Sequence, residues 1–361
     1  MEKAVLEKLL QAFVGVSAAS DDVLRGRGWG DEAGRWNFPI RIKIISEAIM
    51  IHIKYAVVIA TYNRRQLLEE CIDHVRNQTI APDSIIVVNN ASADDTGNYL
   101  INLAKQNELF DMINLPRNIG GAGGFSKGIE RALEKGADCV LIIDDDAMIA
   151  GDYMEQILRM RERQPQYKAF AGTVKTEGKI DTFHRRNIQK AGLRFRNCKE
   201  REYTQPIFAC DIASFCGLVV DTDLIKQIGL PHADYFICHD DAEYSLRIRR
   251  YTGILVVPKA ELNHKAERDD VAYPRRYDWK DYYAVRNRLL MVREHGNFMD
   301  QAINYIDLFI HVIFRNWLFG VMKRDGYDWG YERRLIRKAI RDAGSRNLEN
   351  VIIERCRYQD D

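Results

Sequence analysis

Three consecutive aspartates, Asp144, Asp145 and Asp146, directly follow an apolar run at 139–143. A short β-branched run bounded by charge predicts a buried strand. Carboxylates at the carboxyl end of such a strand occupy the usual ligand position of an open α/β sheet. Asp144 and Asp146 can point the same way along an extended backbone, and their hard oxygen atoms suit Mg²⁺ or Mn²⁺ carrying a diphosphate. A solvated acidic loop is the alternative interpretation of the triplet alone.

Polar loops follow two earlier predicted strands in the same topological position. Thr61, Asn63 and Arg64 come after the first strand. Backbone amides and a guanidinium at this position are suited to bind phosphate. The alternative is that these residues form an ordinary helix N-cap region. Asn90 follows the second strand, and an Asn amide can accept from N3–H and donate to O4 of a pyrimidine. Uracil and thymine share that edge, so the pattern does not separate UDP from dTDP.

A third loop is crowded with glycine. Asn118 precedes four glycines, Gly120, Gly121, Gly123 and Gly124. Glycine permits positive φ and lets a ligand approach the main chain, at a cost in backbone entropy. We expect exposed amides at the start of a helix that begins at Phe125. The spacing matches neither the dinucleotide-binding nor the P-loop fingerprint, and a flexible turn is the alternative.

The elements that must position these residues alternate regularly between strand and helix from residue 54 onward. Strands are predicted at 55–60, 84–88, 112–115 and 139–143, and helices at 65–77, 95–106 and 125–134. This rhythm predicts an α/β fold with a mostly parallel central sheet and helices on both faces. Beyond residue 152 the pattern predicts strands at 169–174, 214–220 and 254–257, helices at 221–227 and 240–250, a loop-rich 175–213, and mainly helix from Trp279.

Composition narrows the class of protein. The 53 basic and 52 acidic residues among 361 leave no global positive field for nucleic acid. Seven cysteines without zinc-binding spacing are typical of core positions in a reducing cytosol. Met1–Ala12 lacks the apolar core of a signal peptide, and no window reaches about 18 uninterrupted apolar residues. We therefore expect a cytoplasmic location.

Five short motifs in order resemble the inverting family 2 glycosyltransferases with the GT-A fold, and most of all their galactofuranosyltransferase and rhamnosyltransferase branch. They read TYNR, VVNNASADDT, RNIGGAGGF, IIDDDA and HDDAEYSLR, within a resemblance that covers 54–287. The resemblance implies a UDP- or dTDP-linked sugar donor, a divalent metal, inversion at the anomeric carbon, and a glycan or lipid-linked acceptor of bacterial envelope type.

The resemblance also implies roles for individual residues. Asp144 and Asp146 match the DxD metal ligands, or the first holds ribose, and Asp145 lies with them at the donor site. His264 lies where related galactofuranosyl enzymes place a third metal ligand. Asn118, Gly120, Gly121, Gly124 and Phe125 match the donor-binding loop. Arg286 and Asn287 match a family signature that we expect to contact phosphate. His239 departs from the aromatic or glycine often found before the acidic pair.

Asp241 matches the acid that serves as general base. A carboxylate at a helix N-terminus is kept ionised by the helix dipole, which favours a base over an acid. Asp240 is then placed to orient the acceptor, and Glu243 to support the site one turn on. The alternative is that Asp240 and Asp241 only cap their helix.

Four parts of the chain follow. We predict an accessory segment of open role at 1–53, a nucleotide-sugar-binding half at 54–150, an acceptor-binding half at 151–300 and a helical segment at 301–361. The apolar, aromatic stretch at 305–322 with its basic tail is typical of a helix in a membrane interface, of one packed on the core, or of one that forms a homo-oligomer. Two rival functions stay open: a sugar-phosphate nucleotidyltransferase and a non-catalytic scaffold with the same fold.

Overall fold

The computed structural model describes residues 53–189, 191–265, 278–314 and 329–345. Residues 54–361 form one compact unit, distinct from 1–53. The predicted accessory segment therefore falls almost wholly outside the described residues. Strands from both predicted halves, 54–150 and 151–300, join a single sheet.

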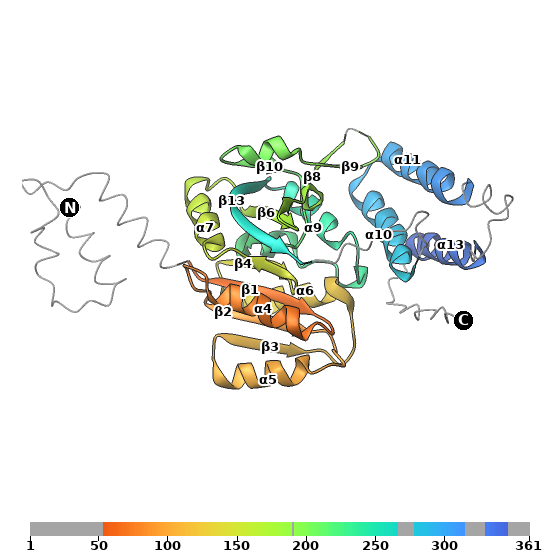
Figure 1. Ribbon diagram of the computed structural model, residues 1–361. Helices are drawn as coiled ribbons and strands as arrows, with labels where there is room; N and C mark the ends of the chain where they lie inside the picture. The colour runs from red at the N-terminus through yellow and green to blue at the C-terminus, as the bar shows by residue number, and fades with distance from the viewer. Residues whose placement is uncertain (1–52, 190, 266–277, 315–328, 346–361) are drawn as a thin grey trace, which may run out of the picture. The chain divides into compact units, whose positions relative to one another are not determined.

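That sheet confirms the predicted mostly parallel α/β architecture (Figure 1). In the described part of the chain it has ten strands, eight of them in the order β10-β13-β6-β12-β4-β1-β2-β3. The parallel block contains β1 (Tyr55–Thr61), β2 (Ser84–Asn89), β3 (Phe110–Asn114) and β4 (Cys139–Asp144). Strand β12 (Leu218–Asp221) runs antiparallel to β4 and to β6 (Ala169–Thr176). Beyond them lie β13 (Ile254–His264), parallel to β6, and the antiparallel edge strand β10 (Phe208–Cys210).

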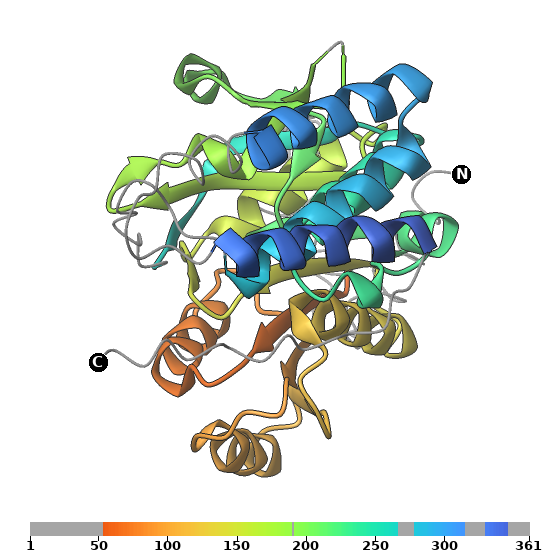
Figure 2. The same cartoon turned by 90° about the vertical axis from the view of Figure 1, so that its right-hand side faces the viewer.

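Helices follow the strands much as their apolar periodicity predicts. They are α4 (Arg65–Arg76), α5 (Thr96–Gln106), α6 (Gly120–Glu134), α7 (Tyr153–Arg163), α8 (Thr222–Ile228) and α9 (Asp240–Arg249). The C-terminal part contains α10 (Trp279–His295), α11 (Phe298–Leu308), the π-helical η4 (Phe309–Phe314) and α13 (Trp329–Ser345). Figure 2 shows α10 between α11 and α13, and α10 also contacts α9.

The largest difference from the sequence prediction lies between β6 and β12. Residues predicted as loop form a second sheet of β11 (Ile212–Ala213), β8 (Arg185–Ile188) and β9 (Phe195–Asn197). The same segment contains β7 (Lys179–Ile180), which pairs with β6, and the 3₁₀ turns Thr182–His184 and Glu200–Thr204. These strands have only two to four residues, and β8 and β9 carry arginines, so they lack the apolar alternation that marks a strand. Strand β5 (Ala147–Ile149) and helix α7 were also not predicted.

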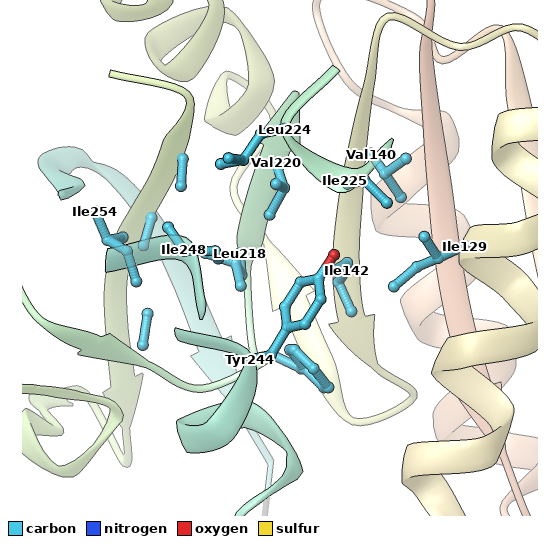
Figure 3. Packing of buried hydrophobic residues seen from close by; sticks show 14 of the residues in the cluster. Ile129, Val140, Ile142, Leu218, Val220, Leu224, Ile225, Tyr244, Ile248 and Ile254 are labelled. Atoms are coloured by element: carbon cyan, nitrogen blue, oxygen red, sulfur yellow. The ribbon is translucent and has the colours of Figure 1, made fainter. Parts of the chain in front are cut away.

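One apolar cluster ties helix α9 to the central sheet. Tyr244 and Ile248 of α9 pack with Ile142 of β4 and Leu218 of β12 in this cluster (Figure 3). All four side chains are fully buried. The helix that begins with Asp240 and Asp241 is therefore fixed against the sheet by its own apolar face.

Helix α11 and η4 present an exposed apolar face. Its exposed side chains are Phe298, Met299, Tyr305, Ile306, Phe309, Ile310 and Phe314. Within the described ranges no helix combines the length and hydropathy that a bilayer span requires. Residues 315–322 of the predicted membrane or subunit contact lie outside those ranges, and the contact stays a prediction.

Candidate active site

The carboxyl ends of the parallel strands bring the predicted loops to one edge of the sheet. In register, Thr61 of β1 lies opposite Asn89 of β2, and Ala60 lies opposite Asp144 of β4. The loops that begin at Thr61, Asn90 and Asp145 therefore leave the sheet side by side.

Pairing between β13 and β5 brings His264 to the acidic triplet. His264 lies opposite Ala147, and the N–H of Lys265 donates to the carbonyl of Asp146 at 2.8 Å. As a result, Nε2 of His264 lies 3.2 Å from Oδ1 of Asp146. Ligand atoms of Asp144, His264 and Cys216 all lie within 4.8 Å of one another. The three residues predicted as metal ligands thus meet, and His264 ends a longer strand than the one predicted at 254–257.

The donor atoms of this cluster fit a hard divalent cation. Burial and then the charge of Asp146 raise the pKa of Asp144 to about 7, so a cation would favour its ionised form. Burial lowers the pKa of His264, but the carboxylate of Asp146 outweighs it and the net shift is upward. Burial keeps the pKa of the Cys216 thiol well above its usual range. The suited donors are therefore the two carboxylates and the imidazole.

Thr61 and Arg64 hold the remaining carboxylate of the triplet. Thr61 Oγ1 donates to Asp145 Oδ2 at 2.7 Å, and Thr61 is 2% exposed. Arg64 Nη1 bridges Asp145 at 3.1 Å and Asp146 at 2.7 Å. Asn63 connects two loops, because its N–H donates to Ser92 Oγ and its side-chain oxygen accepts from the N–H of Ala93. The hydroxyl of Thr61 is thus already hydrogen-bonded to Asp145, whereas the exposed Arg64 faces the acidic triplet.

The glycine segment is the first turn of α6 and not a loop. Gly120 has φ +79°, and a Cβ there would lie 2.1 Å from the carbonyl oxygen of Phe236. That carbonyl accepts from the N–H of Ala122 at 3.1 Å. A Cβ on Gly124 would meet Ala60 at 3.0 Å, so this glycine permits close packing of α6 on β1. Gly120 and Gly124 therefore allow α6 to approach Phe236 and β1 closely, and this role differs from the phosphate binding that we predicted.

Asn90 and Phe125, which were predicted to contact the donor, turn inward, while Asn118 holds Gly120 through its side-chain oxygen alone. Asn90 Nδ2 donates to the carbonyl of Gly120 at 2.7 Å, and its Oδ1 accepts from the N–H of Ile119 at 2.9 Å. Its amide therefore holds the start of α6 and is not turned toward a base. Asn118 Oδ1 accepts from the N–H of Gly120 at 2.8 Å. Phe125 is 4% exposed and packs edge-on against Phe215, so it belongs to the core.

Asp240 and Asp241 begin helix α9, as predicted. Asp241 Oδ1 accepts from the N–H of Ala242 at 2.6 Å. Burial raises the pKa of Asp241, although Arg186 opposes the shift. Burial and the charge of Asp241 raise the pKa of Asp240 to about 8. Desolvation therefore outweighs the helix dipole that we expected to dominate.

The two acidic clusters interact electrostatically. The charge of Asp241 contributes to the raised pKa of Asp144, and the charge of Asp144 contributes to that of Asp240. Arg186 of β8 lies beside Asp241, and with Arg185 it forms a pair of arginines that sequence reasoning missed. Arg185 is fully buried and donates to the carbonyls of Gly172 and Cys216. The only sequence signal was two adjacent arginines in a segment predicted as loop.

Backbone strain marks the segment before the acidic pair. Phe236, Cys238 and His239 have φ of 63°, 69° and 64°, in the left-handed region that non-glycine residues rarely adopt. Strain of this kind persists only where the surroundings hold it. Here the carbonyl of Phe236 is held by α6, and the following residues are held by α10.

Arg286 and Asn287 of α10 supply that second restraint. Asn287 Nδ2 donates to the carbonyls of Tyr235, Ile237 and Cys238 at 2.8, 2.9 and 2.8 Å. Arg286 Nη2 donates to the carbonyl of Asp234 at 2.6 Å. Both side chains are fully buried. The expected phosphate contact is therefore wrong, because the pair orders the loop that delivers Asp240 and Asp241.

The chain is similar in sequence to known glycosyltransferases. Residues 56–220 match the profile described as Glycosyl transferase family 2. A dTDP-rhamnosyl transferase of Shigella flexneri, RfbF, is 27% identical over 250 residues, covering 67% of this chain and 80% of that protein. Galactofuranosyltransferase GlfT2 of Mycolicibacterium smegmatis is 24% identical over 274 residues, but the chain spans only 41% of its length.

Solved structures agree on the fold. GalNAc-T7, crystallised with UDP, GalNAc and Mn²⁺, superposes with a TM-score of 0.54 at 13% identity over 66% of this chain and 48% of that one. Residues 1–349 of S. aureus TarS give a TM-score of 0.52 at 13% identity over 82% of both chains. These likenesses show that the chain has the fold of known GT-A glycosyltransferases, with residues 56–220 similar to glycosyltransferase family 2.

Proposed function

We propose that the protein transfers a hexosyl group from a UDP- or dTDP-linked sugar to a glycan or lipid-linked glycan, with inversion. The observation that carries the proposal is the electrostatic interaction of two acidic clusters, because the charge of Asp241 contributes to the raised pKa of Asp144. One contains Asp144, Asp146 and His264, and the other contains Asp240 and Asp241. A scaffold protein has no need of half-buried carboxylates with raised pKa values, whereas catalytic sites gather them.

The chain's carboxylates account for the proton transfer. The acceptor hydroxyl gives its proton to Asp241 as its oxygen attacks the anomeric carbon from the face opposite the diphosphate. The bond from the anomeric carbon to the diphosphate oxygen breaks in the same step, and the nucleoside diphosphate leaves. A raised pKa makes Asp241 a stronger base than an ordinary carboxylate. Asp240, largely protonated near neutral pH because of its pKa of about 8, is suited to donate a hydrogen bond to the acceptor.

Asp144, Asp146 and His264 would hold Mn²⁺ or Mg²⁺, which supplies charge that stabilises the leaving diphosphate. Arg64 bridges Asp145 and Asp146 and has a half-exposed side chain, so it is placed to contact a phosphate beside them. Asn118 and Gly121 are partly exposed near the start of α6 and are the other donor contacts that we retain.

The activities of the relatives support the choice of donor. A relative that the chain covers to 80% of its length is named a dTDP-rhamnosyl transferase, and several others are named galactofuranosyltransferases. We therefore place dTDP-rhamnose and UDP-galactofuranose first in the panel of donors. A sugar-phosphate nucleotidyltransferase would instead respond to a nucleoside triphosphate with a sugar phosphate.

The decisive experiment has two stages. Thermal unfolding with Mn²⁺ and each nucleotide-sugar identifies the donor, because a ligand at a hundredfold its Kd adds about 2.7 kcal/mol of stability. Asp241→Asn should then keep that stabilisation while turnover falls by about 10²–10⁴. Asp223→Asn is the matched control, since Asp223 lies in the first turn of α8 with its side chain 86% exposed. Equal turnover in Asp241→Asn and the parent chain would refute the assigned base.

A further inference from the structure

We propose that His232, Glu243 and Glu294 bind a Zn²⁺ ion, at a site that shares no residue with the acidic triplet. The three residues come from separate parts of the chain. His232 precedes the strained segment, Glu243 lies in α9 and Glu294 lies near the end of α10. One ligand atom of each lies within 4.8 Å of the others.

The separations suit one small ion. Nε2 of His232 lies 3.7 Å from Oε1 of Glu243 and 3.8 Å from Oε2 of Glu294. Zinc bonds of about 2.0–2.2 Å place two tetrahedral ligands roughly 3.3 Å apart. A movement of about half an ångström therefore brings Nε2 of His232 to the spacing of a zinc ligand from each carboxylate, and the side chains of His232 and Glu294 are exposed enough to move.

Neighbouring side chains already orient Glu243. It is fully buried, and Arg247 donates to its Oε2 at 2.7 and 3.1 Å, which leaves Oε1 toward His232. His295 Nε2 lies 2.9 Å from the same Oε1, with Arg250 at its other ring nitrogen. Carboxylates from α9 and α10 therefore face His232 together.

Tyr235 is an independent indication of a missing partner. It is 3% exposed, and its ring stacks on that of His232 with centroids 5.5 Å apart and 20° between the planes. Among the described residues its buried hydroxyl has no hydrogen-bond partner. Burial, and then the charges of Glu243 and Glu294, raise the pKa of this hydroxyl. A water molecule on the ion would supply the partner it lacks.

Zinc is the metal that this donor set favours. Three protein ligands with an open position for water are a common zinc arrangement, and imidazole suits zinc better than it suits magnesium. Sites with nitrogen and oxygen donors generally bind Zn²⁺ more tightly than Mn²⁺. The ion would link α10 to both ends of the segment that delivers Asp240 and Asp241, and so would complement the restraint by Asn287.

Calorimetric titration of the full chain with Zn²⁺ tests the site without any glycosyl donor. Asp146→Asn serves as the parent, because it weakens the other cation site. We expect one Zn²⁺ per chain in this parent, bound at least about tenfold more weakly after His232→Gln or Glu294→Gln. Glu162→Gln, at an exposed carboxylate on α7, is the matched control and should bind as the parent does.

Glu294 is exposed enough that its substitution leaves the fold intact, and thermal unfolding of each metal-free variant checks this. Zinc should also raise the melting temperature of the parent and of Glu162→Gln more than that of the two ligand variants. Absence of Zn²⁺ binding in the parent, or equal binding in all four proteins, would overturn the proposal. Neither result bears on the glycosyl transfer proposed above, which is measured separately with nucleotide-sugars.

Discussion

Nη2 of Arg186 lies 3.6 Å from Oδ2 of Asp241. The guanidinium is held over the rings of Phe183 and Phe195, with centroid distances of 4.9 and 5.2 Å. Arg186 is 9% exposed, so its charge acts on Asp241 with little screening by solvent. It opposes the upward pKa shift that burial causes in that carboxylate.

Replacing Arg186 by Met should therefore raise the pKa of Asp241 further. A base is active only when ionised, so the acid limb of the pH profile of kcat/KM should move to higher pH. Arg186→Lys keeps a positive charge and should move the limb less. Arg196→Met, at an exposed position on the neighbouring strand β9, is the control and should leave the profile in place. A limb that stays fixed in Arg186→Met would mean that another group sets it.

His264→Gln should weaken the proposed metal site while leaving its two carboxylates in place. Because one of three ligands is lost, we expect the Mn²⁺ concentration for half-maximal activity to rise at least about tenfold. His74→Gln is the control, since His74 Nδ1 contacts the carbonyl of Ile149 and not the acidic cluster. Activity measured against Mn²⁺ concentration gives the comparison. An unchanged metal requirement in His264→Gln would exclude this imidazole as a ligand.

Asn287→Ala should reduce both stability and turnover. Three carbonyls of the strained segment would lose their shared donor, and a buried carbonyl without a donor costs about 1–3 kcal/mol. Because Asn287 acts on the segment that delivers Asp241, we expect kcat to fall while the KM for the nucleotide-sugar changes little. Asn98→Ala, at an exposed position of α5, is the control. Chemical denaturation and steady-state kinetics together decide whether the residue only supports the fold, in which case kcat per folded molecule stays normal.

Comparing Gly120→Ala with Gly136→Ala separates the cost of a steric clash with backbone from the cost of a left-handed backbone conformation. Gly120 and Gly136 have φ of +79° and +71°, but only at Gly120 would a Cβ meet backbone, 2.1 Å from the Phe236 oxygen. Gly136→Ala should therefore cost about 1–2 kcal/mol of stability from the left-handed conformation alone. Gly120→Ala should cost clearly more and also lower turnover, because it displaces the segment before Asp240. Equal losses of stability from the two changes would show that the contact with Phe236 yields easily.

Local pattern was enough to predict the strands that form the parallel block. Tyr55–Thr61, Ser84–Asn89 and Cys139–Asp144 are continuous apolar runs, and only a strand buried on both faces accommodates them. The polar residues at their carboxyl ends then had to meet at one edge of the sheet. The same reasoning located Asp144, Asp146 and Asp241, since carboxylates directly after a buried strand or at a helix start are recognisable without tertiary contacts.

For the remaining residues, contacts between segments distant in sequence determine which partner each side chain binds. His264 meets Asp146 because β13 runs on to pair with β5, and Arg186 meets Asp241 across a small sheet of short, charged strands. Asn90, Phe125, Arg286 and Asn287 have types that suit ligand binding, yet burial turned their side chains inward to backbone or core. Sequence pattern reports local conformation and polarity, whereas the direction in which a polar side chain points depends on which distant carbonyl or carboxylate the fold places beside it.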